Sequence, residues 1–453
     1  MRRAASVRLA FGPWRARASL WLAFAALLVV APLCFPSNAA LTVMTQMGTA
    51  AILALSFNLL LGSTGLLSFC HATYAGVGAY AGVWCMNGIG LHAWPVSMAV
   101  VPLAGGLAAG LAGATLGYVT TRRAGMTFAM ITLGVAELVW VVAAMVPAWF
   151  GGERGIPTDR TLGAPWLGVT FATQREVYGL VAMWLFFCTA AMYGVTRTPL
   201  GFLARAVRDN AGRVAFLGQS PAAVRYRMQI IAAAFAGVAG ALGALNFELV
   251  SADAFSLERS GTVLVFTVLG GTAYFAGPML GAVLGVFVTV VLATITRAWQ
   301  LYLGLAFLAV VRFAPGGVAG LVALHVRAWR AGLVRALWLP YSVLGMGLLL
   351  FAGGLTAIVE MTYASRLADS AGPWTAGSAH GLPGLAMWAC AAAAAAVGLA
   401  VLVRGWRRLR MAATRAGMAG MAASAGMVGM AGMAEMAEMA EMAEMREMTE
   451  MTR

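Results

Sequence analysis

Long apolar stretches separated by short polar loops run through most of this chain. A membrane-spanning helix needs roughly 20 mostly apolar residues, and stretches close to that length recur along the sequence. The pattern predicts an all-α fold, a polytopic transmembrane helical bundle with about ten core spans and an extra C-terminal helical hairpin. We expect the core spans at residues 19–36, 42–61, 71–88, 94–120, 124–149, 177–195, 229–247, 261–275, 277–296 and 299–313, and the hairpin at 340–359 and 384–403.

The pattern also divides the chain into three parts. We expect a core at 1–320, the extra hairpin at 321–403 and a tail at 404–453, which begins with a basic cluster and ends in a Met-Ala-Glu repeat. A period of three gives a helix no fixed face, so we interpret the tail as low-complexity sequence. A Met-rich metal-binding or partner segment is the alternative. Spans 261–275 and 299–313 are short, which leaves open whether they cross fully or re-enter from one side.

The composition agrees with a membrane protein and excludes an ordinary soluble domain. Of 453 residues, 61% are hydrophobic and 10% are charged, whereas soluble domains average about 25% charged residues. In a soluble protein the net charge of +14 would suggest a nucleic-acid partner. In a membrane protein the positions of the basic residues matter instead, and we expect membrane lipid and no nucleic acid around this chain.

The basic residues, which are all arginine, predict the orientation of the chain. When the N-terminus is placed in the cytoplasm and the spans alternate, 24 of the 30 fall inside. This split follows the positive-inside rule and places both termini in the cytoplasm. The basic N-terminus and the apolar run after it resemble a secretory signal, but the many later spans favour an uncleaved first helix.

Motifs for catalysis and metal binding are missing from the sequence. A P-loop needs a lysine on the nucleotide phosphates, and the chain has no lysine. It contains no His-Glu-x-x-His pattern and no Cys-x-x-Cys pair, and its four histidines do not cluster. We therefore expect no enzyme, no catalytic residue, no metal site and no cofactor in this chain.

Two polar features inside apolar stretches are candidates for function. Glu137 lies well inside a predicted span, where a carboxylate is costly and marks a functional site by default; a buried glutamate that fixes one helix against another is the alternative. The stretch "GLLSFCHATYAGVGAYAG" at 65–82 combines glycines with polar side chains. Ser68 is a candidate helix cap, and Gly78 with Gly82 has the spacing of close helix contacts. This stretch either packs closely against other helices or lines the substrate path, and the sequence leaves both interpretations open. His71 is a candidate for the path.

The loop between the predicted spans at 177–195 and 229–247 contains a short amphipathic helix rich in arginine. Gly218 suits a helix C-terminus and Pro221 follows it. Periodicity alone favours a helix anchored among lipid headgroups.

Four stretches, which follow one another along the chain in the order expected for a known family, carry a resemblance to that family. The first two are 65–80 and 132–155, where the matching residues are Gly65, Ser68, His71, Ala72, Gly76, Gly78, Ala79, Tyr80, Thr132, Leu133, Glu137, Gly151, Gly152 and Gly155. The third is the arginine-rich loop, with Pro199, Gly201, Arg205, Arg208, Asp209, Asn210, Leu217 and Gly218. The fourth spans 251–282, with Ser251, Asp253, Phe255, Ser256, Gly270, Gly271, Gly277, Pro278, Gly281 and Ala282.

Over about 40–320 the chain resembles the branched-chain (hydrophobic) amino-acid permease family of bacterial ATP-binding-cassette importers. The resemblance implies a permease subunit in the bacterial inner membrane. It also implies three kinds of partner: a second homologous permease subunit, two cytoplasmic ATP-binding subunits that hold ATP and Mg, and a periplasmic substrate-binding protein.

The resemblance assigns roles to two sets of residues. The loop at 197–227 would couple to the ATP-binding subunits through Arg205, Arg208, Asp209, Asn210, Leu217 and Gly218. The substrate path or the helix packing around it would use Ser68, His71, Gly76, Gly78, Glu137, Gly270 and Gly271.

Other functions stay open beside the importer of branched-chain or related amino acids. The same machine can carry urea or a short amide, since the family includes such permeases. An ion-coupled secondary transporter would use Glu137 as its proton site. A scaffold or membrane enzyme would cause no uptake defect when deleted.

Overall fold

The computed structural model describes residues 14–92, 96–162, 170–314, 316–330, 334–366 and 382–415. The loop predicted between the hairpin helices and the Met-Ala-Glu repeat of the tail lie outside the described residues. The chain forms two compact units: unit 1 is Met1–Thr267 with Pro278–Phe287, and unit 2 is Val268–Gly277 with Val288–Arg453. We describe each unit by itself.

The described residues are almost entirely helical, which confirms the predicted class. In chain order, the elements through α10 are α1 (Trp14–Cys34), α2 (Asn38–Thr64), α3 (His71–His92), η1 (Met98–Val100), α4 (Val101–Thr120), α5 (Met126–Met145), α6 (Pro147–Phe150), η2 (Gly152–Arg154), β1 (Ile156–Pro157), η3 (Arg160–Leu162), α7 (Gln174–Arg197), α8 (Pro199–Phe216), α9 (Pro221–Phe247), β2 (Leu249–Val250), η4 (Ala252–Phe255) and α10 (Leu257–Gly270). The later elements are α11 (Gly277–Val286), the π-helical η5 (Phe287–Leu292), α12 (Ala293–Ile295), α13 (Trp299–Phe313), α14 (Gly317–Arg330), α15 (Val334–Arg366) and α16 (Leu382–Arg415).

The chain is an all-helical polytopic membrane protein. Among the described residues, seven helices are long and apolar enough to cross a membrane, and an eighth is added if the pair Trp299–Arg312 and Gly317–Ala323, bent by 53°, counts as one span. Shorter apolar helices occur at Ala18–Cys34 and Ala386–Leu402. The full count of ten core spans and two hairpin spans stays a prediction.

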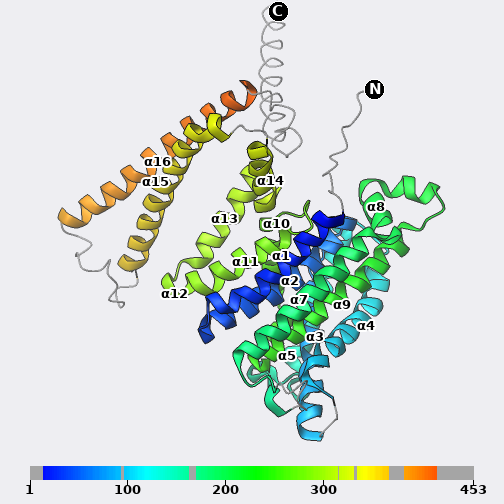
Figure 1. Ribbon diagram of the computed structural model, residues 1–453. Coiled ribbons are helices and arrows are strands. Elements are labelled where there is room, and N and C mark those ends of the chain that lie inside the picture. The colour runs from blue at the N-terminus through cyan, green and yellow to red at the C-terminus, as the bar shows by residue number, and fades with distance from the viewer. Residues whose placement is uncertain are drawn as a thin grey trace, which may run out of the picture. The chain divides into compact units, whose positions relative to one another are not determined.

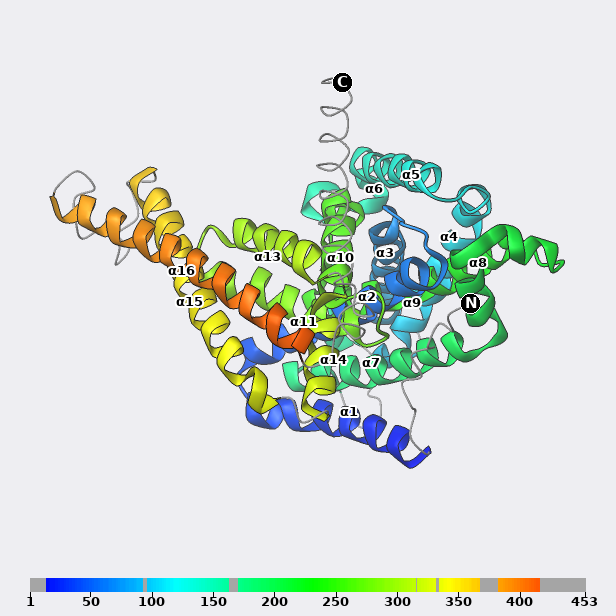
Figure 2. The ribbon, with the colours of Figure 1, turned by 90° about the horizontal axis from the view of Figure 1, so that it is seen from above.

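Helix α9 forms the centre of unit 1 and packs against α2, α3 and α4 (Figures 1 and 2). Glycines allow this packing because they bring helix backbones into direct contact. A Cβ atom at Gly105 of α4 would lie 2.8 Å from the Gly78 carbonyl oxygen of α3 and 2.9 Å from that of Gly237 of α9. Three helices therefore meet at three glycines, and in this part of the bundle the glycine-rich spans serve close packing.

Local signals fix where the central helices begin and end. The Ser37 side chain caps α2, and Gly65 ends it in the left-handed conformation with φ of 71°. Helix α7 begins with a capping box: the Thr173 hydroxyl accepts the Glu176 backbone N–H, and the Glu176 carboxylate accepts the Thr173 backbone N–H. Ser220 caps α9, and Pro221 occupies its first turn.

In unit 2, α15 and α16 run side by side as a helical hairpin (Figure 1). Small residues form the contact: a Cβ atom at Gly354 would lie 2.8 Å from the Ala391 carbonyl oxygen, and one at Gly347 would lie 2.9 Å from the Leu402 nitrogen. The side chain of Glu360 on α15 accepts hydrogen bonds from the hydroxyls of Thr296 and Tyr302. The extra hairpin is thereby tied to the turn between α12 and α13.

Two of the predicted site residues lie in unit 2 where α10 ends: Gly270 is the last residue of α10, and Gly271 begins the turn after it. Gly271 has φ of 104°, a conformation that favours glycine. Any side chain there would collide with the backbone of Gly316, and one at Gly317 would collide with Gly271. The glycines are therefore required by the close approach of two turns.

Candidate functional site

The arginine-rich loop forms α8, which is broken into two short helices. Thr198 caps its start by accepting the Gly201 N–H, and Pro199 stands in the first turn. At Asn210 the backbone is extended, with φ of −160° and ψ of 96°. The Asn210 Oδ1 atom accepts the Arg213 N–H at 2.9 Å, so Asn210 is the cap of the second helix. The single helix expected from the sequence is therefore wrong in this detail, because an asparagine cap competes with helix continuation.

Two arginines of α8 bind the C-terminal ends of neighbouring helices. Arg208 donates from Nη1 to the Gly62 carbonyl oxygen in the last turn of α2. Arg205 donates from Nη2 to the Thr196 carbonyl oxygen at the end of α7, at 3.2 Å. The last carbonyls of a helix lack helical partners and carry negative partial charge, which suits a guanidinium. Both arginines thus fasten α8 to its own bundle.

The far end of α8 presents apolar side chains to its surroundings. Phe216 is 94% exposed and Leu217 is 75% exposed. Gly218 follows with φ of 77°, as expected for a helix end. Asp209 is also exposed and forms an ion pair with Arg208 at 3.2 Å. We call Phe216 and Leu217 the α8 tip; of the two, only Leu217 was singled out from the sequence.

The α2–α3 junction, residues 65–70, connects the end of α2 to the start of α3. Arg208 binds the last turn of α2 just before this junction. Two other helices hold the backbone at and just after the junction: Phe69 N–H donates to Thr132 Oγ1 of α5, and Ala72 N–H in the first turn of α3 donates to Ser260 Oγ of α10, both at 3.1 Å. Ser260 thus caps α3, whereas the Ser68 hydroxyl lies 4.0 Å from Cys70 Sγ. Sequence reasoning chose the nearer serine, because a cap from a residue 188 positions away leaves no local signal.

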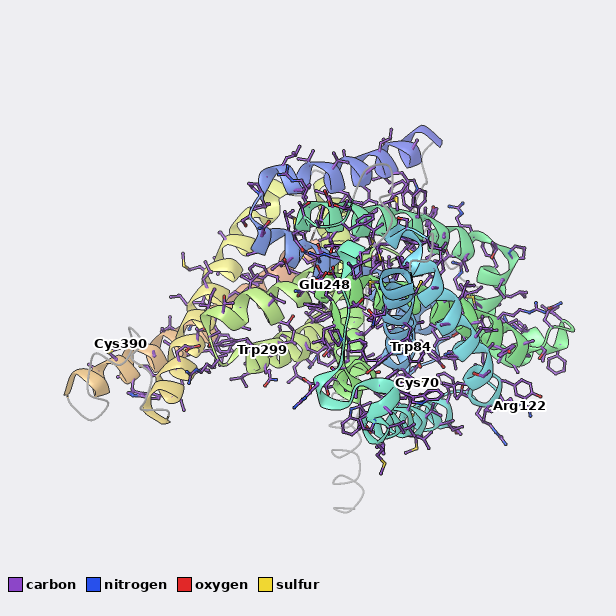
Figure 3. The ribbon with its side chains drawn as sticks, turned by 90° about the horizontal axis from the view of Figure 1, so that it is seen from below. Cys70, Trp84, Arg122, Glu248, Trp299 and Cys390 are labelled. Carbon is purple, nitrogen blue, oxygen red and sulfur yellow. The ribbon has the colours of Figure 1, made fainter. Side chains whose placement is uncertain are left out.

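His71 lies inside the bundle at the start of α3. It is fully buried, its Nε2 atom lies 2.8 Å from Ser56 Oγ of α2, and its ring contacts Phe57 edge to face. Figure 3 labels Cys70, the preceding residue in the chain, among the helices of unit 1. His71 therefore connects α2 to α3.

Gly76 and its neighbours on α3 contact the segment between α9 and α10. A Cβ atom at Gly76 would meet the Phe255 ring at 2.5 Å. The same ring stacks on Tyr80 with 5.2 Å between centroids, and the Tyr80 hydroxyl donates to the Phe150 carbonyl oxygen at 2.9 Å. Gly76 is required here because an aromatic ring fills the place of its side chain.

Glu137 lies on α5, one residue after the buried Ala136, and is half-buried. Within the part of the chain that the structure describes, no hydrogen bond or ion pair reaches its carboxylate. Much of α5 exposes large apolar side chains, among them Met130, Leu138 and Val142. The structure therefore brings no partner to Glu137 from unit 1.

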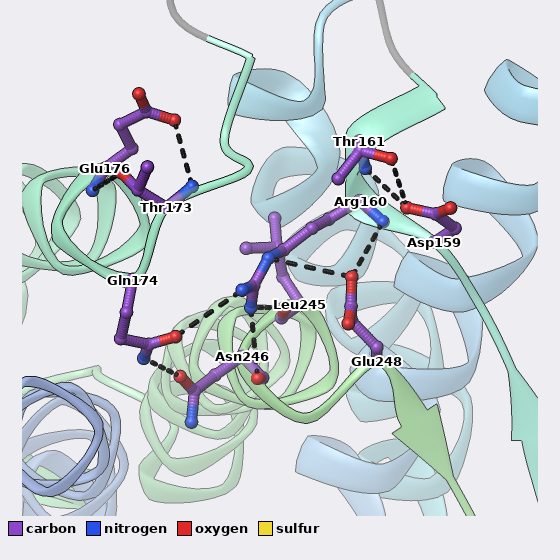
Figure 4. A network of polar contacts seen from close by, with 9 residues as sticks. All are labelled: Asp159, Arg160, Thr161, Thr173, Gln174, Glu176, Leu245, Asn246 and Glu248. Carbon is purple, nitrogen blue, oxygen red and sulfur yellow. Dashed lines mark hydrogen bonds and ion pairs between the residues drawn. The ribbon is translucent and has the colours of Figure 1, made fainter. Parts of the chain in front are cut away.

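A polar network at the ends of α7 and α9 was missed by sequence reasoning (Figure 4). The Arg160 guanidinium donates to the carbonyl oxygens of Leu245 and Asn246, at 3.4 and 3.3 Å, and so caps α9. Glu248 Oε1 accepts the Arg160 backbone N–H at 3.1 Å and lies 3.6 Å from Nε. Gln174 joins the network through a 2.8 Å bond to Asn246.

The same region pairs two very short strands. β1 and β2 run antiparallel, with Ile156 opposite Val250 and Pro157 opposite Leu249. Nearby, the Thr161 hydroxyl and backbone N–H both donate to the Asp159 carboxylate and hold its pKa below the usual range. Arg160 and Glu248 lie 88 positions apart in the chain, and the strand partners are similarly distant, so no local pattern marks them.

The described residues contain no group of three or more His, Cys, Asp or Glu side chains that could hold a metal ion. All five cysteines are free, and Cys70 and Cys188 are buried. The polar contacts reported above come instead from arginines, hydroxyls and amides near helix ends.

Comparison with known proteins identifies the family. The model of the family described as "Branched-chain amino acid transport system / permease component" matches residues 39–315, more than half of the 453-residue chain. The high-affinity branched-chain amino acid transport system permease protein LivM of Salmonella typhimurium is 30% identical over 254 residues, which cover 51% of this chain and 59% of the relative. LivM of Escherichia coli is 29% identical with the same coverage.

The matched segment thus spans less than two thirds of these curated relatives. No solved structure matches the chain. The family match covers α2 to α13, including α8 and the α2–α3 junction. The chain therefore belongs to the family of branched-chain amino-acid transport permease components, and it is a multi-pass membrane protein.

Proposed function

We infer that this chain is the membrane permease subunit of an ATP-driven importer for branched-chain or related amino acids. The observation that carries the inference is the construction of α8. Its arginines fasten it to the ends of α2 and α7, while its apolar tip stays exposed. A helix held at its base with a free apolar end is suited to receive a push from a partner and pass it to the bundle.

The contacts around α8 support a route for this push. Movement of α8 pulls on the end of α2 through Arg208, and the α2–α3 junction begins three residues beyond the bound Gly62 carbonyl. From the junction, Thr132 and Ser260 continue the route to α5 and α10. Rigid helices joined by discrete hydrogen bonds can move as bodies, which alternating access requires.

The remaining parts of the machine are proposed from the family. Two cytoplasmic ATP-binding subunits would hold ATP and Mg and contact the loop at 197–227. A second homologous permease subunit and a periplasmic binding protein would complete the assembly in the bacterial inner membrane. The names of the relatives support branched-chain amino acids over urea or short amides as cargo.

The membrane arrangement is proposed from the arginine distribution. Both termini would lie in the cytoplasm, with ten core spans and the hairpin as two more. The match at 39–315 supports a core at 1–320, with the hairpin at 321–403 and the tail at 404–453 outside it.

For the proposed path residues, the contacts favour helix packing over direct contact with cargo. Gly76 and Gly78 touch neighbouring helices, and His71 bonds to α2. We propose that these residues set the spacing of α3, and that Ser68 belongs to the junction. Gly270 and Gly271 would serve the turn after α10, and Glu137 would be a packing residue without a proton-carrying role.

Leucine uptake into proteoliposomes that contain the whole assembly tests this function. We expect uptake to require ATP on the cytoplasmic side, to favour leucine over urea, and to persist within about twofold in Glu137→Gln, because a half-buried carboxylate without a partner needs no charge to hold its place. An ion-coupled transporter predicts the opposite: uptake without ATP under an ion gradient, and its loss in Glu137→Gln.

A further inference from the structure

A pocket opens in unit 1 beside the network of Figure 4. Its volume is about 490 Å³, within the range of ordinary small-molecule sites. Its lining is polar apart from one alanine and consists of Asn38, Thr42, Arg160, Ala172, Thr173 and Gln174.

The cation of the pocket is held in place before any ligand arrives. The Arg160 side chain is only 12% exposed. The carbonyls of Leu245 and Asn246 hold Nη1, and Gln174 Oε1 lies 3.5 Å from Nη2. A guanidinium has five N–H donors. With Nη1 directed at the two carbonyls and one Nη2 donor directed at Gln174, the second Nη2 donor remains for a charge-assisted hydrogen bond to a ligand carboxylate. Because its position is fixed, little side-chain entropy is lost when an anion binds.

Two long helices start at the same pocket and add to its positive potential. Asn38 is the first residue of α2, which Ser37 caps, and Gln174 is the first residue of α7, which Thr173 caps. The N-terminal end of a helix carries positive partial charge and favours anions. Helix ends are common, so they support the site but do not define it; the pocket and Arg160 do.

The acidic groups nearby limit the strength of the site. Glu248 lies 3.6 Å from Arg160 Nε and Glu176 closes the capping box of α7, but neither lines the pocket. Their charges partly offset the cation, so binding in the millimolar range is expected. Weak binding suits a protein that must release its cargo.

We propose that this pocket binds the carboxylate group of a small zwitterionic amino acid as it enters the permease. The inference rests on the proposed function and on the orientation that places the starts of α2 and α7 outside. Among the described residues that line the pocket, Ala172 is the one apolar member, so the pocket recognises the polar head of the ligand and not its apolar side chain. It therefore accepts several amino acids of similar size.

The test is saturation-transfer NMR on the full chain in lipid nanodiscs, with L-leucine and L-leucinamide as probes. We expect saturable leucine binding and about tenfold weaker binding of leucinamide, which lacks the negative charge, as the loss of one charged hydrogen-bonded contact implies. Arg160→Gln and Ala172→Trp should lose leucine binding at least as strongly. Arg175→Gln is the matched control, since Arg175 is exposed, neighbours Gln174 and does not line the pocket.

Ala172→Trp keeps the experiment decisive if Arg160→Gln fails to fold, because it fills the pocket and leaves the α9 cap untouched. The proposal is overturned if wild-type protein shows no saturable leucine binding, if leucinamide binds as well as leucine, or if Ala172→Trp binds like wild type. If leucine does not bind at the pocket but ATP-driven uptake is intact, the pocket proposal fails and the proposed function stands. Leucine binding at the pocket with uptake independent of ATP would reject the proposed function alone.

Discussion

Arg208→Ala is expected to lower ATP-driven uptake at least about tenfold while the assembly still forms and hydrolyses ATP. The substitution removes the bond from α8 to the Gly62 carbonyl at the end of α2. A hydrogen bond to a charged group is worth about 1.5–3 kcal/mol, and about 1.4 kcal/mol of lost coupling is a tenfold effect. The tip of α8 remains, so the partner would still dock but would move the bundle less.

Arg213→Ala is the matched control for this result. Arg213 lies on the second helix of α8, is exposed, and contributes only its backbone N–H to the Asn210 cap. Uptake and ATP hydrolysis measured side by side in proteoliposomes distinguish uncoupling from failed assembly. Equal uptake by Arg208→Ala and Arg213→Ala would reject the proposed route through α2.

Gly78→Val should destabilise the bundle by about 3 kcal/mol, the upper end of the cost of overpacking. The new side chain would collide with the backbone of Gly237 on α9, which cannot move aside as a side chain would. The same contact includes Gly105, so the strain reaches three helices.

The loss of stability is measurable as a lower midpoint of thermal unfolding in detergent, followed by a thiol-reactive dye. Cys34, Cys85 and Cys390, which are not fully buried, are first replaced by serine in all samples; the remaining Cys70 and Cys188 are buried and react only when the bundle opens. Gly134→Val on α5 is the control, because no heavy atom lies within 4 Å of its added Cβ. If both variants unfold at the same temperature, the contact among Gly78, Gly105 and Gly237 does not contribute to the stability of unit 1 as expected.

Sequence reasoning succeeded where the signal was local and repeated. Apolar runs of sufficient length predicted helices such as α2, α4 and α9, because burial in a bilayer demands them. The role expected for Gly78, in the substrate path or in helix packing, stays a prediction. The C-terminal helices α15 and α16 pack side by side, and their assignment as an extra transmembrane hairpin stays a prediction.

The features that sequence reasoning missed depend on partners far away in the chain. Arg205 and Arg208 bind backbone carbonyls, which every residue carries and no sequence motif marks. Ser260 caps α3, and Glu248 pairs with Arg160, only because the fold brings these residues together. The break at Asn210 did have a local signal, an asparagine before a short apolar turn, but the amphipathic pattern outweighed it.

The α8 tip offers the most direct test of the account, since the central claim is that a partner drives transport through it. We would compare wild type, Phe216→Asp and Phe216→Leu in the whole assembly, measuring retention of the ATP-binding subunits and ATP-dependent leucine uptake. The account predicts that Phe216→Asp, which places a charge on a side chain that is 94% exposed, loses both at least about tenfold. It predicts that Phe216→Leu keeps both; full retention and uptake in Phe216→Asp would contradict the account.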